Sequence, residues 1–373
     1  MNLDGEDKTS PSILIRKAKM PIIDLFHPFV PQEVIHEVSN TLHTRFIGQG
    51  PKVDLFEQLF SDKFNTRYSV SMNSGSSALE TAYELADIKT GDEVITTPLT
   101  CTATNIPFLR MGTKIVWADI RKDTLCIDRD DILRKVTDKT KAVVNVHLGG
   151  IENELGDMPV PVISDACQAL GVFNGDYTCN SFQAIKHITT GDGGMLTVNS
   201  ESEMRYAKLT RWFGIDREKK IANNWQAYQK RAMTFDIEVL GYKRQMTDIA
   251  ATMGIVGLTY YDRIIEHRQR IFNLYKELLK GVDGITVIDG EHNTYWLCTV
   301  LVERRDEFAS KMFECGIDTN LVQIRNDVYK IFGGRVELPV MDWVESRYIS
   351  LPLTMQTTED NVRYICDCIK EGW

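Results

Sequence analysis

The stretch YSVSMNSGSSALETAYELADIKTGDEVITT, residues 68–97, decides the fold class. Two short runs typical of strands, YSVSM and EVITT, enclose a segment in which apolar residues recur at helical spacing from Ser77 to Asp87. Strands that alternate with helices in this way predict a parallel sheet covered by helices.

The alternation continues downstream of this stretch. Strands are expected in KIVWADI, AVVNVHL and PVPVISD, and helices at 104–111 and 129–136. Because several of these runs are apolar throughout, both faces of the sheet should be covered. The sequence predicts a doubly wound α/β domain of the kind that binds ligands at the carboxyl ends of its strands, where Ser74, His147 and Asp165 fall.

A second, smaller α/β domain is expected at 246–373, and the pattern past Gly241 leads out of the large domain. Helical spacing first continues over some ten turns, which indicates one long bent helix or two helices. Two strand-like runs, GITVID and YWLCTVLVE, and two helices follow. With 373 residues the chain can bury both cores. The predicted division is an N-terminal extension at 1–20, a large domain at 21–245 and a small domain at 246–373.

Composition excludes some partners and locations. The net charge of -9 is spread along the chain, which argues against nucleic acid or an anionic membrane as the partner. No run approaches the roughly 18 apolar residues of a membrane span, and residues 1–19 are too polar for a signal peptide. A cytoplasmic protein is expected. Its eight cysteines lack metal-site spacing, so reduced thiols and no metal are predicted.

The strongest chemical signal is Lys186, in the glycine-rich stretch SFQAIKHITTGDGGML, together with Asp165 at the end of an apolar run. Pyridoxal phosphate chemistry needs such a pair, since the lysine condenses with the cofactor aldehyde and the acid keeps the pyridine nitrogen protonated. Burial and a neighbouring cation would give the lysine the low pKa that this role requires. A surface lysine and a helix-capping aspartate are the plain alternatives.

A polar turn at 73–77 opens the first helix and suits a phosphate group. Backbone amides and the helix dipole attract the anion, and Gly75 allows close approach beside Ser76, although ordinary capping explains the same residues. Ser181 could add a hydroxyl, and Gln168 could contact the cofactor ring.

Three further residues receive secondary roles. His187 is interpreted as a supporting or incidental neighbour of Lys186, because adjacent loop side chains diverge. His147 is expected to line the same cleft. For Cys101, packing is favoured over catalysis.

The chain resembles the DegT/DnrJ-type sugar aminotransferases, which have the aspartate aminotransferase fold of pyridoxal phosphate enzymes. The likeness spans about residues 22–370 and rests on motifs in the family's order, among them FIGQGPKVDLFE, NSGSSALETA, GDEVITTPLTCTATN, KAVVNVHLGG, ISDACQALG, SFQAIKHITTGDGGML, GYKRQMTDIAATMG and YISLPL. On matching positions, it implies that Lys186 bonds to the cofactor, Asp165 pairs with the pyridine nitrogen and Gln168 contacts the ring. It implies a phosphate site made of three residues: Gly75, Ser76 and Ser181.

The resemblance also implies a reaction. Glutamate would donate an amino group to a nucleotide-linked keto sugar, by family frequency a 4-keto-6-deoxy sugar. The enzyme would be a homodimer in which part of GYKRQMTD reaches the partner's site. The alternatives are a dehydratase of the same fold, which has histidine in place of the reactive lysine, and a regulatory protein that binds the cofactor without catalysis.

The chain departs from the family pattern at several positions. Cys101 stands where an aromatic residue commonly stacks on the cofactor. Lys243 and Arg244 replace a frequent Asn and Tyr. Asn320 and Arg325 occupy a region in which many relatives have a histidine, which suggests a different sugar.

Overall fold

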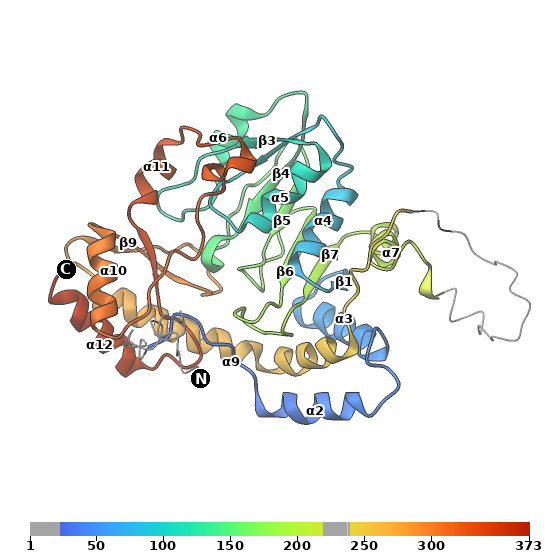
Figure 1. The fold of residues 1–373 in the computed structure, drawn as a ribbon, viewed down its shortest axis with the longest axis horizontal. Coiled ribbons are helices and arrows are strands. Elements are labelled where there is room, and N and C mark those ends of the chain that lie inside the picture. Colours follow the sequence, from blue (N-terminus) through green and yellow to red (C-terminus); the bar gives the residue numbers. More distant parts are fainter. Residues whose placement is uncertain (1–22, 219–236, 238) are drawn as a thin grey trace, which may run out of the picture.

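A seven-stranded sheet forms the centre of the molecule in the computed structural model, which describes residues 23–218, 237 and 239–373 (Figure 1). Its strand order is β1-β7-β6-β5-β4-β2-β3. The last five of these strands run parallel, whereas β7 pairs antiparallel with both neighbours. The strands are β1 (Tyr68–Met72), β2 (Glu93–Thr96), β3 (Lys114–Trp117), β4 (Thr140–Val146), β5 (Val162–Asp165), β6 (Tyr177–Ser181) and β7 (Gly194–Val198). The prediction of a mostly parallel α/β sheet is confirmed.

Helices cover both faces of this sheet. The core on one face is formed with α4, and the core on the other face is formed with α3 and α9. The α-helices between residues 32 and 278 are α2 (Gln32–Leu42), α3 (Pro51–Phe64), α4 (Gly75–Leu85), α5 (Thr102–Met111), α6 (Arg129–Lys135), α7 (Glu201–Thr210) and the long α9 (Asp248–Leu278). The segment expected to be a long bent helix or two helices is a single helix of 31 residues.

A three-stranded antiparallel sheet, in the order β10-β9-β8, lies near the C-terminal end of α9 (Figure 1). Its own apolar core includes residues of α9, α10 and α12. The elements of this part are β8 (Ile285–Val287), β9 (Cys298–Val302), α10 (Arg305–Glu314), α11 (Pro339–Glu345), β10 (Tyr348–Leu351) and α12 (Glu359–Lys370). The domain bounds 21–245 and 246–373 stay a prediction, and the expected extension at 1–20 lies outside the described residues.

Asp248, the first residue of α9, joins the two motifs FIGQGPKVDLFE and GYKRQMTD. Its carboxylate accepts hydrogen bonds from the backbone N–H groups of Gly50, Lys52 and Val53 at 2.7 to 3.2 Å. These amides lie at the start of α3, where N–H groups lack the acceptors of a full helical turn, although that of Val53 also contacts the Gly50 carbonyl oxygen at 3.2 Å. The carboxylate therefore caps the helix.

Within the described part of the chain, no helix has the length and apolar character needed to cross a membrane.

Candidate active site

The predicted phosphate-binding residues meet at the carboxyl ends of the central strands. Gly75 begins α4, and Ser181 ends β6. A Cβ atom added to Gly75 would lie 2.9 Å from Ser181 Cβ and 2.9 Å from Cys167 Sγ. The missing side chain therefore lets the helix start approach the strand end, and only glycine fits there without displacing its neighbours.

The start of α4 has donors to offer an anion. Ser74 caps the helix by accepting a hydrogen bond from the backbone N–H of Ser77 at 3.1 Å. Among the described residues, the N–H groups of Gly75 and Ser76 have no acceptor. Both the free amides and the helix dipole favour a phosphate at this turn.

Asp165 ends β5 and is buried, with 4% of its surface exposed. One carboxylate oxygen accepts a hydrogen bond from Thr104 Oγ1 at 2.7 Å, and the other accepts from the backbone N–H of Cys167 at 3.1 Å. The two donors fix the plane of the carboxylate, and its remaining lone pairs can receive a protonated ring nitrogen. Thr104 lies within the motif GDEVITTPLTCTATN, but nothing in that stretch indicates that its hydroxyl contacts Asp165.

Thr104 is itself held by a buried hydrogen-bond network from the far end of the chain. Asn326 accepts a hydrogen bond from Asn105 Nδ2 and donates one to the carbonyl oxygen of Thr100, each at 2.8 Å. The hydroxyls of Thr100 and Thr104 are 2.9 Å apart. This network ties residues 97–105 to the C-terminal part of the chain and thereby supports the partner of Asp165.

Lys186 lies on the loop between β6 and β7, and its side chain is partly buried. Burial lowers the pKa of its amine, while electrostatic interactions with Cys167, Asp165 and Cys101 act in the opposite direction. Within the described residues, no hydrogen bond or ion pair joins Lys186 Nζ to another side chain. Instead, the amine lies 3.8 Å from the centre of the Trp296 ring. A partly desolvated amine without a carboxylate partner is suited to attack an aldehyde.

Gln168 and the two histidines occupy fixed positions. Gln168 Oε1 accepts a hydrogen bond from the backbone N–H of Gly149 at 2.8 Å, which leaves its amide donors for another partner. His187 is buried with Nε2 at 2.7 Å from the Thr294 carbonyl oxygen. Burial, reinforced by the Arg268 guanidinium, lowers the pKa of His187 to about 3, so this neutral ring supports the loop. Its interpretation as a supporting residue is consistent with this geometry.

His147 does not line the cleft as expected. It is completely buried, where Nε2 lies 2.7 Å from Ser164 Oγ and Nδ1 accepts a hydrogen bond from the backbone N–H of Asn153 at 3.0 Å. Burial lowers the pKa of His147 to about 4. The strand-end position suggested the cleft, but the side chain points into the protein and holds the loop that follows β4.

The stretch with Lys243 and Arg244 lies beside the phosphate turn of its own chain. The carbonyl oxygen of Arg244 accepts a hydrogen bond from the backbone N–H of Asn73 at 2.6 Å, and that of Lys243 accepts one from Asn73 Nδ2 at 3.2 Å. The Arg244 guanidinium pairs with Glu80 and Glu84 of α4 at 2.8 and 3.1 Å. Arg244 therefore holds α4 in place, and the Lys243 side chain is exposed.

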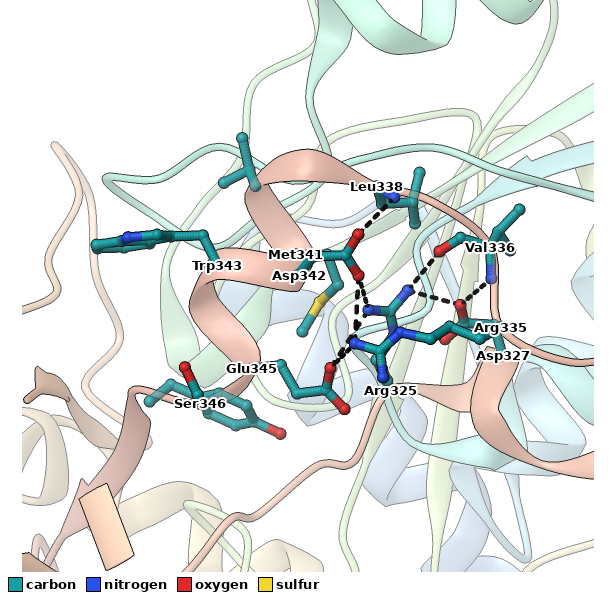
Figure 2. Close-up of polar contacts among 12 residues, drawn as sticks. Arg325, Asp327, Arg335, Val336, Leu338, Met341, Asp342, Trp343, Glu345 and Ser346 are labelled. Atoms are coloured by element: carbon teal, nitrogen blue, oxygen red, sulfur yellow. Dashed lines mark hydrogen bonds and ion pairs between the residues drawn. The ribbon is translucent and has the colours of Figure 1, made fainter. Parts of the chain in front are cut away.

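Arg325, which the sequence suggested as a determinant of sugar identity, is fully buried in an ion cluster (Figure 2). Its guanidinium makes two hydrogen bonds to Asp327, at 2.7 and 2.6 Å, and further contacts to Asp342, Glu345 and the Val336 carbonyl oxygen. With its donors engaged in this way, Arg325 is a structural residue and cannot contact a sugar.

The residues present fit pyridoxal phosphate. The Gly75 turn offers free amides and close approach, Asp165 offers an oriented carboxylate, and Lys186 offers an amine of lowered pKa. A mostly parallel α/β sheet that gathers these three groups at the carboxyl ends of its strands defines a pyridoxal phosphate enzyme of the transferase type.

Comparison with known proteins identifies the family of this chain. The chain belongs to the DegT/DnrJ/EryC1/StrS aminotransferase family, whose model matches residues 30–370, and it is a pyridoxal phosphate-dependent aminotransferase. It is 30% identical over 377 residues to the spore coat polysaccharide biosynthesis protein SpsC of Bacillus subtilis, covering 92% of this chain and 95% of the relative.

Two other relatives carry the names of sugar enzymes. The dTDP-4-dehydro-2,3,6-trideoxy-D-glucose 4-aminotransferase of Saccharopolyspora spinosa is 27% identical over 381 residues, 93% of this chain and 95% of the relative. The solved sugar aminotransferase CalS13 of Micromonospora echinospora is 28% identical with a TM-score of 0.87, covering 94% of this chain and all of the other. These names support amino transfer over dehydration and over a purely regulatory role.

Proposed function

We propose that this enzyme transfers an amino group from glutamate to a nucleotide-linked keto sugar, with a 4-keto-6-deoxy sugar as the acceptor. The products are 2-oxoglutarate and an amino sugar for polysaccharide biosynthesis. The observation that carries the proposal is the convergence of Lys186, Asp165 and the Gly75 turn at one end of the sheet. The names of the S. spinosa and B. subtilis relatives support the sugar and the pathway class.

Each residue has a defined role in this proposal. When bound, the cofactor supplies an aldehyde carbon that bonds to amines and a ring that withdraws electrons. Lys186 Nζ would hold the cofactor through its aldehyde carbon, and as a free amine it would take a proton from the donor's α-carbon and later give one to the sugar. Asp165 keeps the ring nitrogen protonated through the carboxylate that Thr104 and the Cys167 amide orient.

The remaining site residues bind rather than react. The Gly75 and Ser76 amides and the Ser181 hydroxyl hold the phosphate, and Gln168 contacts the ring through the amide donors that Gly149 leaves free. By binding the phosphate and the ring, these residues would orient the cofactor toward Lys186, and such positioning contributes much of the rate in reactions of this kind.

We further propose a cytoplasmic homodimer whose two sites lie at the interface. Support comes from apolar side chains near the GYKRQMTD stretch: Leu240 is 88% exposed and Tyr242 is 54% exposed. Exposed apolar residues gathered at one place favour a protein interface. Light scattering should give twice the chain mass of 42.5 kDa, and a monomer mass would refute the shared site.

The reaction can be tested with glutamate labelled with nitrogen-15 and a panel of nucleotide-linked keto sugars. Mass spectrometry should find the heavy nitrogen in the sugar product, and Lys186→Ala should form none. A sugar product that has lost water and gained no nitrogen would replace the proposal with dehydration.

A further inference from the structure

A buried indole lies against the amine of Lys186. The Trp296 side chain comes from the segment before β9, 110 residues further along the chain, and only 1% of it is exposed. Lys186 Nζ is 3.8 Å from the centre of its ring, within the distance at which a cation is attracted to an aromatic face. The sequence gives no sign of this contact.

The ring is fixed to the loop that carries the lysine. Trp296 Nε1 donates a hydrogen bond to the carbonyl oxygen of Ile185 at 3.0 Å, directly before Lys186. Phe26 packs on the indole with ring centres 5.9 Å apart and planes inclined by 28°. His187, on the other side of Lys186, contacts the Thr294 carbonyl oxygen at 2.7 Å. The indole is therefore held in place independently of where the lysine side chain points.

The segment that carries the indole is also attached to the turn that receives Gln168. The backbone N–H of Leu297 donates to the Gly149 carbonyl oxygen, and that of Thr294 donates to the Gly150 carbonyl oxygen, each at 2.8 Å. A Cβ atom on Gly150 would lie 2.7 Å from the backbone nitrogen of Trp296, so the two segments are in close contact. The segment that carries Trp296 is thus hydrogen-bonded to the turn whose Gly149 contacts Gln168.

We propose that the indole face of Trp296 is the docking place for the Lys186 amine whenever that amine is not bonded to the cofactor, which makes Trp296 a positioning residue. The inference rests on the proposed role of Lys186. During each exchange the lysine is displaced and has to return, and a docked amine stays in the cleft instead of turning into solvent. The ring attracts the ammonium form more than the neutral amine.

The other groups around Lys186 act on the same proton. Asp165, Cys167 and Cys101 favour the ammonium form, whereas burial opposes it. The His187 ring, which burial and the Arg268 guanidinium keep neutral, also interacts electrostatically with Lys186. Substitution of the indole leaves Asp165, Cys167, Cys101 and His187 in the chain, and a comparison of an aliphatic with an aromatic replacement separates the aromatic face from mere bulk.

The test compares Trp296→Leu, which removes the aromatic face, with Trp296→Phe, which keeps one. Lys122 and Trp343 supply a matched control, since Lys122 Nζ also lies 3.8 Å from its ring centre but at the surface. Trp343 is on α11 and points away from the Arg325 cluster (Figure 2). The full-length chain is freed of cofactor with hydroxylamine, and labelling of Lys186 by reductive methylation is followed against pH by mass spectrometry.

Trp296→Leu should lower the proton affinity of Lys186 about tenfold, seen as a lower pH midpoint of labelling, because a desolvated cation loses its aromatic partner. Trp296→Phe should retain most of that affinity, and Trp343→Leu should leave the Lys186 midpoint unchanged. An unchanged or higher midpoint in Trp296→Leu, or an equal shift in Trp296→Phe, would overturn the proposal.

A second measurement leaves the core intact. Tryptophan emission of the cofactor-free chain should titrate with the Lys186 midpoint, and this component should vanish in Lys186→Met. Identical titrations in the two chains would refute the docking. Borohydride reduction of the purified enzyme separates the two hypotheses: a label on Lys186 without a midpoint shift refutes only the docking, whereas a label elsewhere refutes the proposed function.

Discussion

Lys186 and Arg325 are two cationic side chains that are removed from water, and their surroundings shift their pKa values in opposite directions. For Arg325, burial alone would lower the pKa of the guanidinium, but hydrogen bonds to Asp327 and Asp342 outweigh it and raise the pKa. For Lys186, burial prevails and the pKa is lowered. The arginine is surrounded by carboxylates, whereas the lysine faces an indole ring.

The difference separates a structural charge from a reactive one. A guanidinium that is fully hydrogen-bonded to carboxylates holds segments together and has no donor left for a ligand. An amine without such a partner can lose its proton and form a bond. Both residues stood out in the sequence as possible site residues, and only their surroundings distinguish them.

Replacement of the reactive cation should have the largest effect. Lys186→Ala should reduce amino transfer by about 10⁴-fold or more, because it removes both the attachment point and the group that moves the proton. Steady-state assays with glutamate measure the loss. The exposed Lys122→Ala serves as the control and should retain full activity.

Asp165→Ala should reduce the rate by about 10³-fold, since the ring nitrogen would lose its proton and the ring its capacity to withdraw electrons. Asp165→Asn keeps the shape of the side chain and should show a loss of similar size. If the Asn variant retained wild-type activity, the charge of Asp165 would have no role.

The structural cation should affect stability instead of chemistry. Arg325→Met leaves Asp327 buried without its partner and should lower the free energy of unfolding by about 3–5 kcal/mol. Urea denaturation measures this change. Arg335→Met, at the exposed edge of the same cluster, should cost less than about 1 kcal/mol. An equal loss of unfolding free energy in Arg325→Met and Arg335→Met would contradict the structural role of Arg325.

The two buried histidines should make stability depend on pH. Burial lowers the pKa of His147 to about 4 and that of His187 to about 3, whereas both take up a proton near pH 6.5 when unfolded. The unfolded state therefore binds more protons in this range, and stability should fall as pH falls through 6.5.

The expected loss between pH 7.5 and 5 is about 2 kcal/mol for each histidine. Urea denaturation at the two pH values measures it. His147→Asn should weaken the pH dependence, and a matched change at the exposed His36 should not. A wild-type pH dependence in His147→Asn would contradict the assignment of His147 as a buried neutral ring.

The smallest effect is expected from the residue that orients Asp165. Thr104→Val removes one hydrogen bond to the carboxylate and should lower kcat by about tenfold, with folding retained. Thr102→Val, on the same helix, is the matched control. An unchanged kcat in Thr104→Val would show that the Cys167 amide alone is enough to orient Asp165.

Much of the large sheet could be predicted because its signals are local. Apolar runs indicated β1 to β5, and Gly75 and Asp165 were predicted from their positions at a helix start and a strand end. Ser181 was predicted from its place five residues before Lys186. Neither β6 nor β7 was predicted. For β6 the reason is that YTCNS is largely polar, so that it is a strand through its pairing with β5 and β7.

The rest of the site depends on contacts between distant residues. Thr104 is 61 residues from Asp165, and Trp296 is 110 residues from Lys186, so no motif contains either pair. For Arg325 the sequence showed a charge in a region where many relatives have a histidine, but not the carboxylates that surround it. Whether a charge is neutralised is decided by tertiary packing, which the sequence pattern does not report.

Borohydride reduction of the purified enzyme, followed by peptide mapping, tests the reactive half of this contrast most directly. The reduced cofactor should be found on the peptide that contains Lys186 and on no other. A label on a different lysine, or a purified enzyme that binds the cofactor but cannot be labelled at all, would contradict the account.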